Sequence, residues 1–287
     1  MARSLRRLVA LPALAVTALA VAVAPSCRPV GGSGHPGPSA PVRDTEEGGR
    51  QGGAEEVERL KVKVLEVLPH DRDAFTQGLE IAGGVLYEST GVVGKSTMRA
   101  GPLDGSPGVR VPLPTPLFGE GVAVVGSTVW QLTWRNGIAV ERDARTLAER
   151  RRVPYQGEGW GLCHQKGRGR LVMSDGSSRL TFRDPRTLAK TGEVSVTADG
   201  QPVTRLNELE CVGDTVYANV WGSDRIMRID PDSGAVTGRI DAEGLLSPRE
   251  GARADVLNGI AAVPGTDQFL ITGKWWPKMF RVLFEAA

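Results

Sequence analysis

The chain has 287 residues, of which 35 are basic and 33 acidic, and this near balance excludes the strongly basic surface of a nucleic-acid-binding protein. Glycine is abundant at 37 residues and hydrophobic residues make up 40%, which is typical of many short strands joined by tight turns. A chain of this length can bury a substantial core as one all-β domain.

The first 27 residues have the features of an export signal. A positive start with three arginines precedes an apolar run from Leu8 to Ala24. The run is short and contains proline, which favours a cleaved signal over a membrane span. Cys27 follows in a segment that is similar to a bacterial lipoprotein box. Lipidation of Cys27, with attachment to a membrane, and simple cleavage both remain open. The protein is expected to be exported, either secreted or anchored on the outer face of the cell membrane.

The segment 28–56 holds eight glycines and four prolines with scattered charge. Such a segment cannot bury enough apolar surface to fold, so a flexible linker is expected. The folded domain is then predicted over residues 57–287.

One sequence unit recurs five times in this domain. It begins with a polar or aromatic residue that is usually followed by a glycine, and it continues with an apolar strand, a turn and a second strand. The spacings between the first residues are 43, 40, 47 and 51, a period typical of propeller blades and not of helical solenoids. These first residues are Gln77, Glu120, Trp160, Asn207 and Asn258.

Each copy continues with a third strand, such as 138–142, 180–183 or 226–229, and an Asp-containing turn. A fourth strand follows, such as 235–240. Four short antiparallel strands make one blade. The prediction is an all-β, five-bladed β-propeller with four-stranded antiparallel blades.

The last copy is incomplete, because only four residues follow its third strand at 279–283. The alternating segment 61–68 precedes the first copy. We expect it to close the ring as the outer strand of the last blade, which would protect the edges.

Two cysteines, Cys163 and Cys211, lie in the folded domain, near the starts of successive copies. Export permits a disulfide. Because nothing in the sequence fixes their separation, two buried free thiols are favoured over a bridge.

The copies also indicate where function can lie, because their first residues are equivalent and should encircle one axis. The ends of the second strands form another equivalent set, Gly91, Trp134, Gly176, Trp221 and Lys274. Burial of polar groups costs free energy unless they are hydrogen-bonded, and tryptophan is a large side chain that is rarely used without a specific purpose. These residues therefore favour a central pocket. The alternative is that they plug the channel and pair with one another.

Several segments carry a family resemblance. They include Phe75-Thr76-Gln77-Gly78-Leu79-Glu80, Phe118-Gly119-Glu120-Gly121, Gly157-Glu158-Gly159-Trp160-Gly161, Arg205-Leu206-Asn207-Glu208-Leu209-Glu210, Ala218-Asn219-Val220-Trp221 and Thr272-Gly273-Lys274. Residues 60–284 resemble the glutamine cyclotransferase family, the plant and bacterial type of glutaminyl-peptide cyclotransferase. The resemblance implies a five-bladed propeller, without a metal or other cofactor, that acts as a monomer on peptides or proteins with N-terminal glutamine.

The resemblance implies site residues one by one. Glu120 corresponds to the proposed catalytic acid/base, with Lys274 and Asn207 as further catalytic groups. The substrate-binding positions correspond to Gln77, Phe118, Trp134, Trp160 and Trp221. The implied reaction converts N-terminal glutamine to pyroglutamate and releases ammonia.

The implied reaction is intramolecular, because the nucleophile is the α-amine of the same glutamine whose side-chain amide it attacks. The two reacting groups are therefore already close, and the enzyme needs only to hold the conformation in which they meet. Glu120 can take a proton from the α-amine and give one to the leaving ammonia. Lys274, Asn207 and Gln77 are donors suited to the developing oxyanion. The three indoles can exclude water and clamp the glutamine side chain. For each group a purely structural role in the channel is the alternative.

Two other functions fit some of the same residues. Glu120, Asn207 and Asn258 could bind calcium, as in lactonase-like propeller hydrolases. Against this, five blades are counted and a matching aspartate is missing. The second alternative is a non-catalytic surface propeller that binds a partner. Natural substrates, a structural ion and the biological role of the product are left open by the sequence.

Overall fold

The structure is a computed structural model that describes residues 56–104, 106 and 108–287. The predicted signal, its Cys27 and the predicted linker up to residue 55 lie outside the described residues. In the part that is described, no helix is long and apolar enough to cross a membrane.

Three sheets contain four antiparallel strands each, in chain order. The first comprises β2 (Thr76–Ala82), β3 (Val85–Thr90), β4 (Thr97–Gly101) and β5 (Val109–Pro112). The second comprises β6 (Gly119–Val125), β7 (Thr128–Thr133), β8 (Ile138–Asp143) and β9 (Glu149–Pro154). The third comprises β10 (Leu162–Gln165), β11 (Arg170–Ser174), β12 (Arg179–Arg183) and β13 (Lys190–Ser195).

An eight-stranded sheet has the order β16-β17-β18-β19-β1-β22-β21-β20. Its members are β16 (Leu206–Val212), β17 (Thr215–Val220), β18 (Arg225–Ile229), β19 (Val236–Asp241), β20 (Leu257–Ala262), β21 (Phe269–Gly273), β22 (Lys278–Ala286) and β1 (Glu58–Pro69). The small elements are the two-stranded pair β14 (Thr197–Ala198) and β15 (Gln201–Pro202), a 3-10 turn at Lys166–Arg168 and the helix α1 (Pro248–Gly251).

The prediction that segment 61–68 pairs with the last strand of the chain is confirmed by the contact of β1 with β22. β1 lies antiparallel to β22, with Leu60 opposite Ala286 and Pro69 opposite Lys278. It also lies parallel to β19 over Glu58–Lys61, which joins two groups of four strands into one sheet. The sequence did not indicate this parallel contact.

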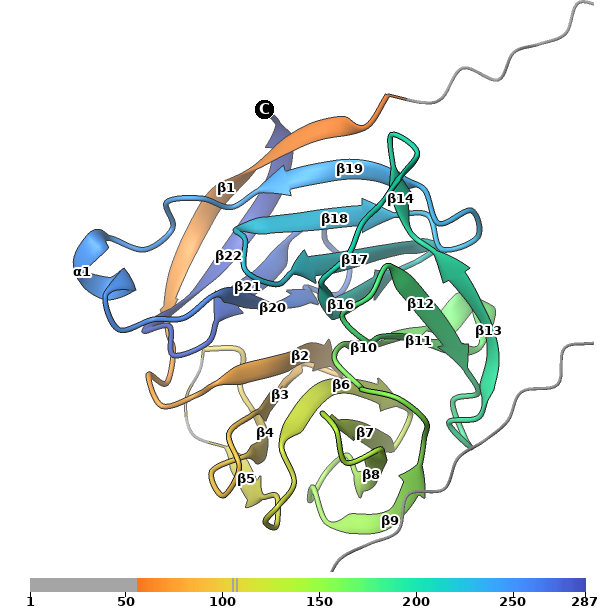
Figure 1. Cartoon of the computed structure of the whole chain (residues 1–287). Helices are drawn as coiled ribbons and strands as arrows, with labels where there is room; N and C mark the ends of the chain where they lie inside the picture. The colour runs from red at the N-terminus through yellow and green to blue at the C-terminus, as the bar shows by residue number, and fades with distance from the viewer. Residues whose placement is uncertain (1–55, 105, 107) are drawn as a thin grey trace, which may run out of the picture. The chain divides into compact units, whose positions relative to one another are not determined.

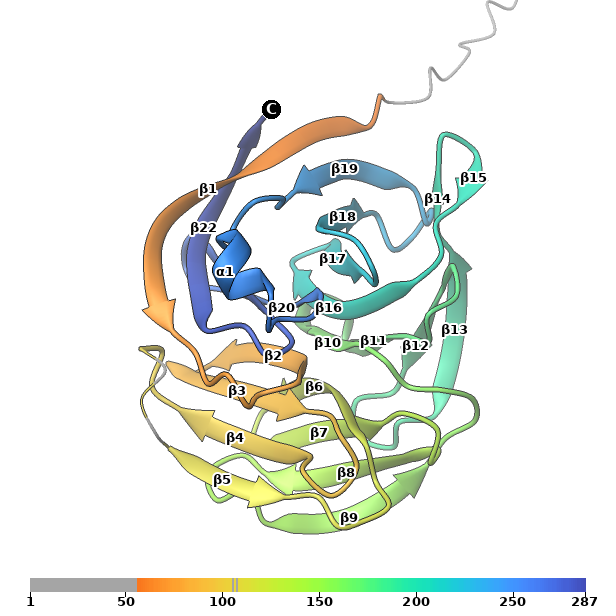
Figure 2. The same cartoon turned by 60° about the vertical axis from the view of Figure 1, so that its left-hand side comes forward.

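The innermost strands of the five groups of four, β2, β6, β10, β16 and β20, face a common centre (Figures 1 and 2). β2 contacts β6 and β20, β10 contacts β6 and β16, and β16 contacts β20. In β6 every residue but the last is buried, because both of its faces meet neighbouring sheets. The outer strand β9 is mostly exposed and carries three consecutive arginines.

Equivalent turns repeat the same local chemistry. Asp143 and Asp184 each accept hydrogen bonds from the backbone N–H groups two and three residues later and from a threonine hydroxyl. Leu147 and Leu188 then adopt φ of 58° and 60° and are buried. The carboxylate therefore fixes the turn, and the strained leucine packs between sheets.

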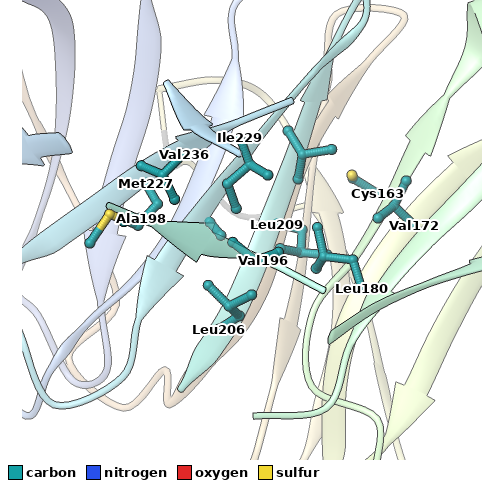
Figure 3. Packing of buried hydrophobic residues seen from close by; sticks show 12 residues of the cluster. Cys163, Val172, Leu180, Val196, Ala198, Leu206, Leu209, Met227, Ile229 and Val236 are labelled. Atoms are coloured by element: carbon teal, nitrogen blue, oxygen red, sulfur yellow. The ribbon is translucent and has the colours of Figure 1, made fainter. Parts of the chain in front are cut away.

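Hydrophobic side chains fill the spaces between neighbouring sheets. Figure 3 shows one such cluster, in which residues of β10 to β12 pack against residues of β16 to β19. Cys163 belongs to this cluster, Cys211 packs against it, and the two form a disulfide with a Cα–Cα distance of 5.4 Å. The expectation of two free thiols was wrong, because adjacent innermost strands bring the two copies together. Such a bond typically contributes about 2–4 kcal/mol to stability.

Candidate functional site

Four innermost strands carry a β-bulge near their beginning, and each bulge holds the first residue of a sequence copy. The register shifts fall around Gln77 in β2, Glu120 in β6, Asn207 in β16 and Asn258 in β20. Bulges re-aim side chains and are common beside active sites. We call this end of the innermost strands, where β2, β6, β10, β16 and β20 begin, the site end.

The glycine that follows most of these residues lets neighbouring strands approach. A Cβ on Gly78 would lie 2.6 Å from the backbone nitrogen of Val122, and one on Gly121 would lie 2.6 Å from that of Leu162. No side chain fits there, so the strands converge and their first residues meet. In the fourth copy Glu208 takes the place of the glycine.

Gln77, Glu120 and Asn258 form a hydrogen-bonded chain. Gln77 Nε2 donates to Glu120 Oε1 at 2.9 Å. Asn258 Nδ2 donates to Gln77 Oε1 at 3.3 Å and to the backbone oxygen of Thr76 at 3.1 Å. Since Asn258 donates to the oxygen of the Gln77 amide, the nitrogen of that amide is directed at the Glu120 carboxylate.

Glu120 is 4% exposed, and its burial raises the pKa of its carboxyl well above the ordinary value. The Lys274 ammonium acts in the opposite direction, and the Glu158 carboxylate raises the pKa further. Burial disfavours the charged form because it removes water from it. A carboxyl of this kind can hold a proton at a pH at which an exposed glutamate is ionised.

Lys274 lies at the end of β21 and is also 4% exposed. Burial lowers the pKa of its ammonium, whereas the Glu120 and Asp255 carboxylates raise it. Its Nζ lies 4.8 Å from the centre of the Phe75 ring, within the range of a cation–π contact. Lys274 and Glu120 thus influence each other's pKa across the centre of the molecule.

Asn207 is buried, with 2% of its surface exposed. Among the described residues its Oδ1 has no hydrogen-bond partner. A buried amide oxygen without a partner is costly, so this group is available to a bound molecule that can donate a hydrogen bond.

Aromatic side chains form two groups near the ends of the same strands. In the first group the Phe75 ring meets the Phe118 ring at 6.1 Å, and Phe118 meets Trp134 at 5.5 Å. In the second group Trp160 meets Trp221 edge to face at 6.1 Å. Trp221 is 44% exposed, so this cluster reaches the surface.

Glu158 connects the two aromatic groups. Its Oε2 accepts from Trp134 Nε1 at 2.8 Å and from Trp160 Nε1 at 3.0 Å. Its Oε1 accepts from Arg135, whose guanidinium lies 4.0 Å from the centre of the Trp134 ring. Partial burial raises the pKa of Glu158, but the hydrogen bonds from Trp160, Arg135 and Trp134 outweigh it, so the pKa is lowered. One carboxylate thus holds both indoles.

Metal-ligating side chains do not gather at this site. Within residues 56–104, 106 and 108–287, no group of three or more His, Cys, Asp or Glu side chains could hold a metal ion. The arrangement can support proton transfer and hydrogen bonding to a polar ligand.

Comparisons with known proteins agree with one another. The sequence profile described as glutamine cyclotransferase matches residues 40–284. The chain belongs to the glutamine cyclotransferase family. A glutaminyl-peptide cyclotransferase from Arabidopsis thaliana is 38% identical over 235 residues, which are 79% of this chain and 72% of the relative. The crystal structure of Myxococcus xanthus glutaminyl cyclase has a TM-score of 0.73 and 39% identity, and the match covers 81% of this chain and 100% of that chain.

The structure brings together the residues that the family resemblance implied. Glu120, Gln77, Asn207 and Lys274 are all buried at the site end. The four predicted aromatic residues meet in the two pairs described above.

Three further residues of the site were missed by the sequence reasoning: Phe75, Glu158 and Trp275, whose ring contacts that of Phe75 with a centroid distance of 4.7 Å. Phe75 and Glu158 stand in the segments that carry the family resemblance, beside Gln77 and Trp160. Trp275 directly follows Lys274. Proximity in sequence to an assigned residue was therefore the signal that could have found them.

Proposed function

We propose that this protein is a glutaminyl-peptide cyclotransferase that converts N-terminal glutamine of peptides or proteins to pyroglutamate and releases ammonia. Membership of the family supports this activity. The observation that carries the proposal is the buried Glu120 carboxyl, which is held by Gln77 and influenced by the Lys274 ammonium that lies over the Phe75 ring.

The reaction forms one bond and breaks one. The α-amine nitrogen of the substrate bonds to the side-chain amide carbon of the same residue, and the bond from that carbon to the amide nitrogen breaks. The amine attacks only in its neutral form, and because a peptide α-amine has a pKa of about 8, it needs only modest help to lose its proton. The enzyme must hold the folded-back conformer and move protons.

Glu120 is assigned the proton transfers. It takes a proton from the attacking amine and delivers one to the departing nitrogen, which leaves as ammonia. The raised pKa of its carboxyl suits both steps, because it brings the group closer to the pKa of the groups with which it exchanges protons. Gln77 already donates to Glu120 and is therefore assigned to hold this carboxyl in place.

Lys274 and Asn207 are assigned to the substrate. Lys274 can donate to the amide oxygen, where negative charge develops as the ring closes. Asn207, whose Oδ1 has no partner among the described residues, can accept from the substrate α-amine. Phe118, Trp134, Trp160 and Trp221 can exclude water and enclose the aliphatic part of the glutamine side chain.

The experiment that tests this function is an ammonia-release assay with purified residues 57–287 and a glutamine-initiated peptide. Turnover is expected for the free peptide. The same peptide with an acetylated amino terminus is the matched control and should give no ammonia, because the nucleophile is blocked. Absence of turnover with the free peptide would reject the proposed activity.

We also propose that the fold is a five-bladed β-propeller. Three four-stranded sheets, together with two groups of four strands within the eight-stranded sheet, support this count. In this interpretation the parallel contact between β1 and β19 joins two neighbouring blades without altering either.

Export and membrane attachment are a further proposal. The apolar run from Leu8 to Ala24 supports export, and so does the Cys163–Cys211 disulfide, because such bonds persist in oxidising compartments. Replacement of Cys27 by serine should release the protein from the membrane fraction if Cys27 is lipidated. Unchanged fractionation would contradict lipidation.

A further inference from the structure

A hollow lies beside the Phe75 and Phe118 rings of the site described above. It has a volume of about 540 Å³, which lies within the usual range of ligand pockets. Its walls come from the loop between β3 and β4, from β5, and from the turn after β21. Among the lining residues are Asp73, Val92, Lys95, Arg110, Pro112 and Trp275.

This hollow shares its walls with the proposed active site. The exposed Trp275 ring contacts the Phe75 ring with a centroid distance of 4.7 Å. Gly91 also lines the hollow, and it packs against Phe118 so closely that an added Cβ would lie 2.4 Å from the Phe118 ring. Phe75 thus contacts both Trp275, which lines the hollow, and the Lys274 ammonium of the proposed active site.

The backbone of the hollow is held in an unusual conformation on two of its walls. Val92 has φ of 81° and Trp275 has φ of 58°. A β-branched residue at positive φ is a rare and costly outlier. Hydrogen bonds fix both positions: Val92 accepts from the Ser96 backbone and hydroxyl, and Trp275 N–H donates to Ala74. Such strain is characteristic of positions held rigid for binding.

The charges of the hollow are mixed, with a positive excess. Lys95 and Arg110 contribute two cations, and Asp73 contributes one carboxylate. All three side chains belong to exposed residues. An extended peptide advances by roughly 3.3–3.6 Å per residue. A peptide whose first residue is enclosed at Glu120 must continue outward at the site end.

We propose that this hollow is the subsite for the peptide residues that follow the N-terminal glutamine, and that Lys95 and Arg110 make it favour an acidic residue there. Trp275 supplies an apolar surface for the peptide chain. The inference rests on the proposed cyclotransferase activity and names the substrate class for it: peptides with a carboxylate shortly after the glutamine.

The test compares two matched peptides, Gln-Gly-Glu-Gly and Gln-Gly-Lys-Gly, both amidated at the C-terminus. The wild type should have the higher kcat/KM for the glutamate peptide. In the double variant Lys95→Glu/Arg110→Glu this preference should reverse, by roughly two- to fivefold for each charge. The effect should shrink as salt is added, because both charges are exposed.

Lys61→Glu/Lys63→Glu is the charge-matched control, since it also reverses two positive charges and both lysines are exposed residues of β1. It should keep the wild-type ratio. A ratio in the double variant equal to that of the wild type would overturn the subsite. Failure of the wild type to release ammonia from either peptide would instead reject the proposed function.

Trp275→Ala gives a second test that does not depend on charge. Glutamine amide has no residue after its glutamine. The variant should therefore lower kcat/KM for the glutamate peptide more than for glutamine amide. An equal loss for both substrates would count against binding of the peptide chain to Trp275.

Discussion

Two buried carboxyls on the innermost strands, Glu120 and Glu208, differ in their surroundings. Both stand at a β-bulge, and burial raises the pKa of both well above the ordinary value. Glu120 accepts a hydrogen bond from the side chain of Gln77, and the positive charge of Lys274 acts to lower its pKa. Glu208 accepts from the backbone N–H of Leu79 at 2.7 Å, a contact between two innermost strands.

The difference shows that burial alone does not assign a carboxyl to chemistry. Glu208 takes the position that glycine has in other copies, and it satisfies a backbone group of the opposite strand. Within the described part of the chain, Glu120 interacts with the side chains of Gln77 and Lys274 and not with a backbone group. We therefore assign proton transfer to Glu120 and a structural role to Glu208.

The largest expected effect is that of Glu120→Gln. Glutamine is nearly isosteric and can still accept from Gln77, but it cannot exchange protons. The rate should fall by roughly 10²–10⁴-fold, the usual contribution of general acid–base catalysis. Measurement of kcat for ammonia release gives the effect, and the melting temperature should stay at or above that of the wild type. If activity is retained, Glu120 is not the acid/base.

A smaller effect, on stability, is expected at Glu208. Glu208→Ala removes the acceptor of the Leu79 N–H and should cost about 1–3 kcal/mol of unfolding free energy, measured by denaturant titration. Glu208→Gln keeps an acceptor and is the matched control. Loss of activity in Glu208→Gln comparable to that of Glu120→Gln would erase the distinction between the two carboxyls.

The pH dependence of stability should also separate wild type from Glu208→Gln. Because the pKa of Glu208 is raised in the folded state, its contribution to stability is complete below the pKa of the unfolded chain and is lost as the pH rises through the folded pKa. The melting temperature of Glu208→Gln relative to wild type should therefore increase from pH 5 to pH 8. A constant difference would contradict a raised pKa.

The smallest expected effect is that of Glu158→Gln on the pH profile. The Glu158 carboxylate contributes to the raised pKa of Glu120, so removal of its charge should lower that pKa. The acid limb of the pH profile of kcat/KM should therefore move to lower pH, because Glu120 would lose its proton at a lower pH. The substrate amine titrates identically with both enzymes, so a difference between them belongs to the protein.

Glu285→Gln is the control for Glu158→Gln, because Glu285 forms an exposed ion pair with Lys63 where β22 pairs with β1. It should leave the acid limb in place. Glutamine at position 158 can still accept a hydrogen bond from an indole, so a changed KM with an unmoved limb would assign Glu158 a purely positional role.

Much of the site could be predicted from the repeats. Equivalent positions in equivalent copies must fall at the same end of the innermost strands, so Gln77, Glu120 and Asn258 could be placed together before any coordinates were known. The pairing of segment 61–68 with the last strand followed from a missing strand. The specific roles required the family resemblance, because a repeat places residues without assigning chemistry to them.

The remaining features depend on contacts that no repeat encodes. Glu158 lies in a connection between two copies, and its link to Trp134 and Trp160 depends on how that connection is folded. The disulfide depends on the distance between adjacent innermost strands. The hollow at Trp275 depends on the unusual φ of Val92 and of Trp275 itself, which propensities do not predict.

The pairing of β1 with β22 has a consequence for the synthesis of the protein. β1 is the first strand of the described chain to be made, and its antiparallel partner is the last. β1 therefore remains without its antiparallel partner until β22 has been synthesised. Lys61, Lys63 and Glu66 place charges along it, which discourages association with other chains in the meantime. Maturation is thus expected to be completed only when the C-terminal residues arrive.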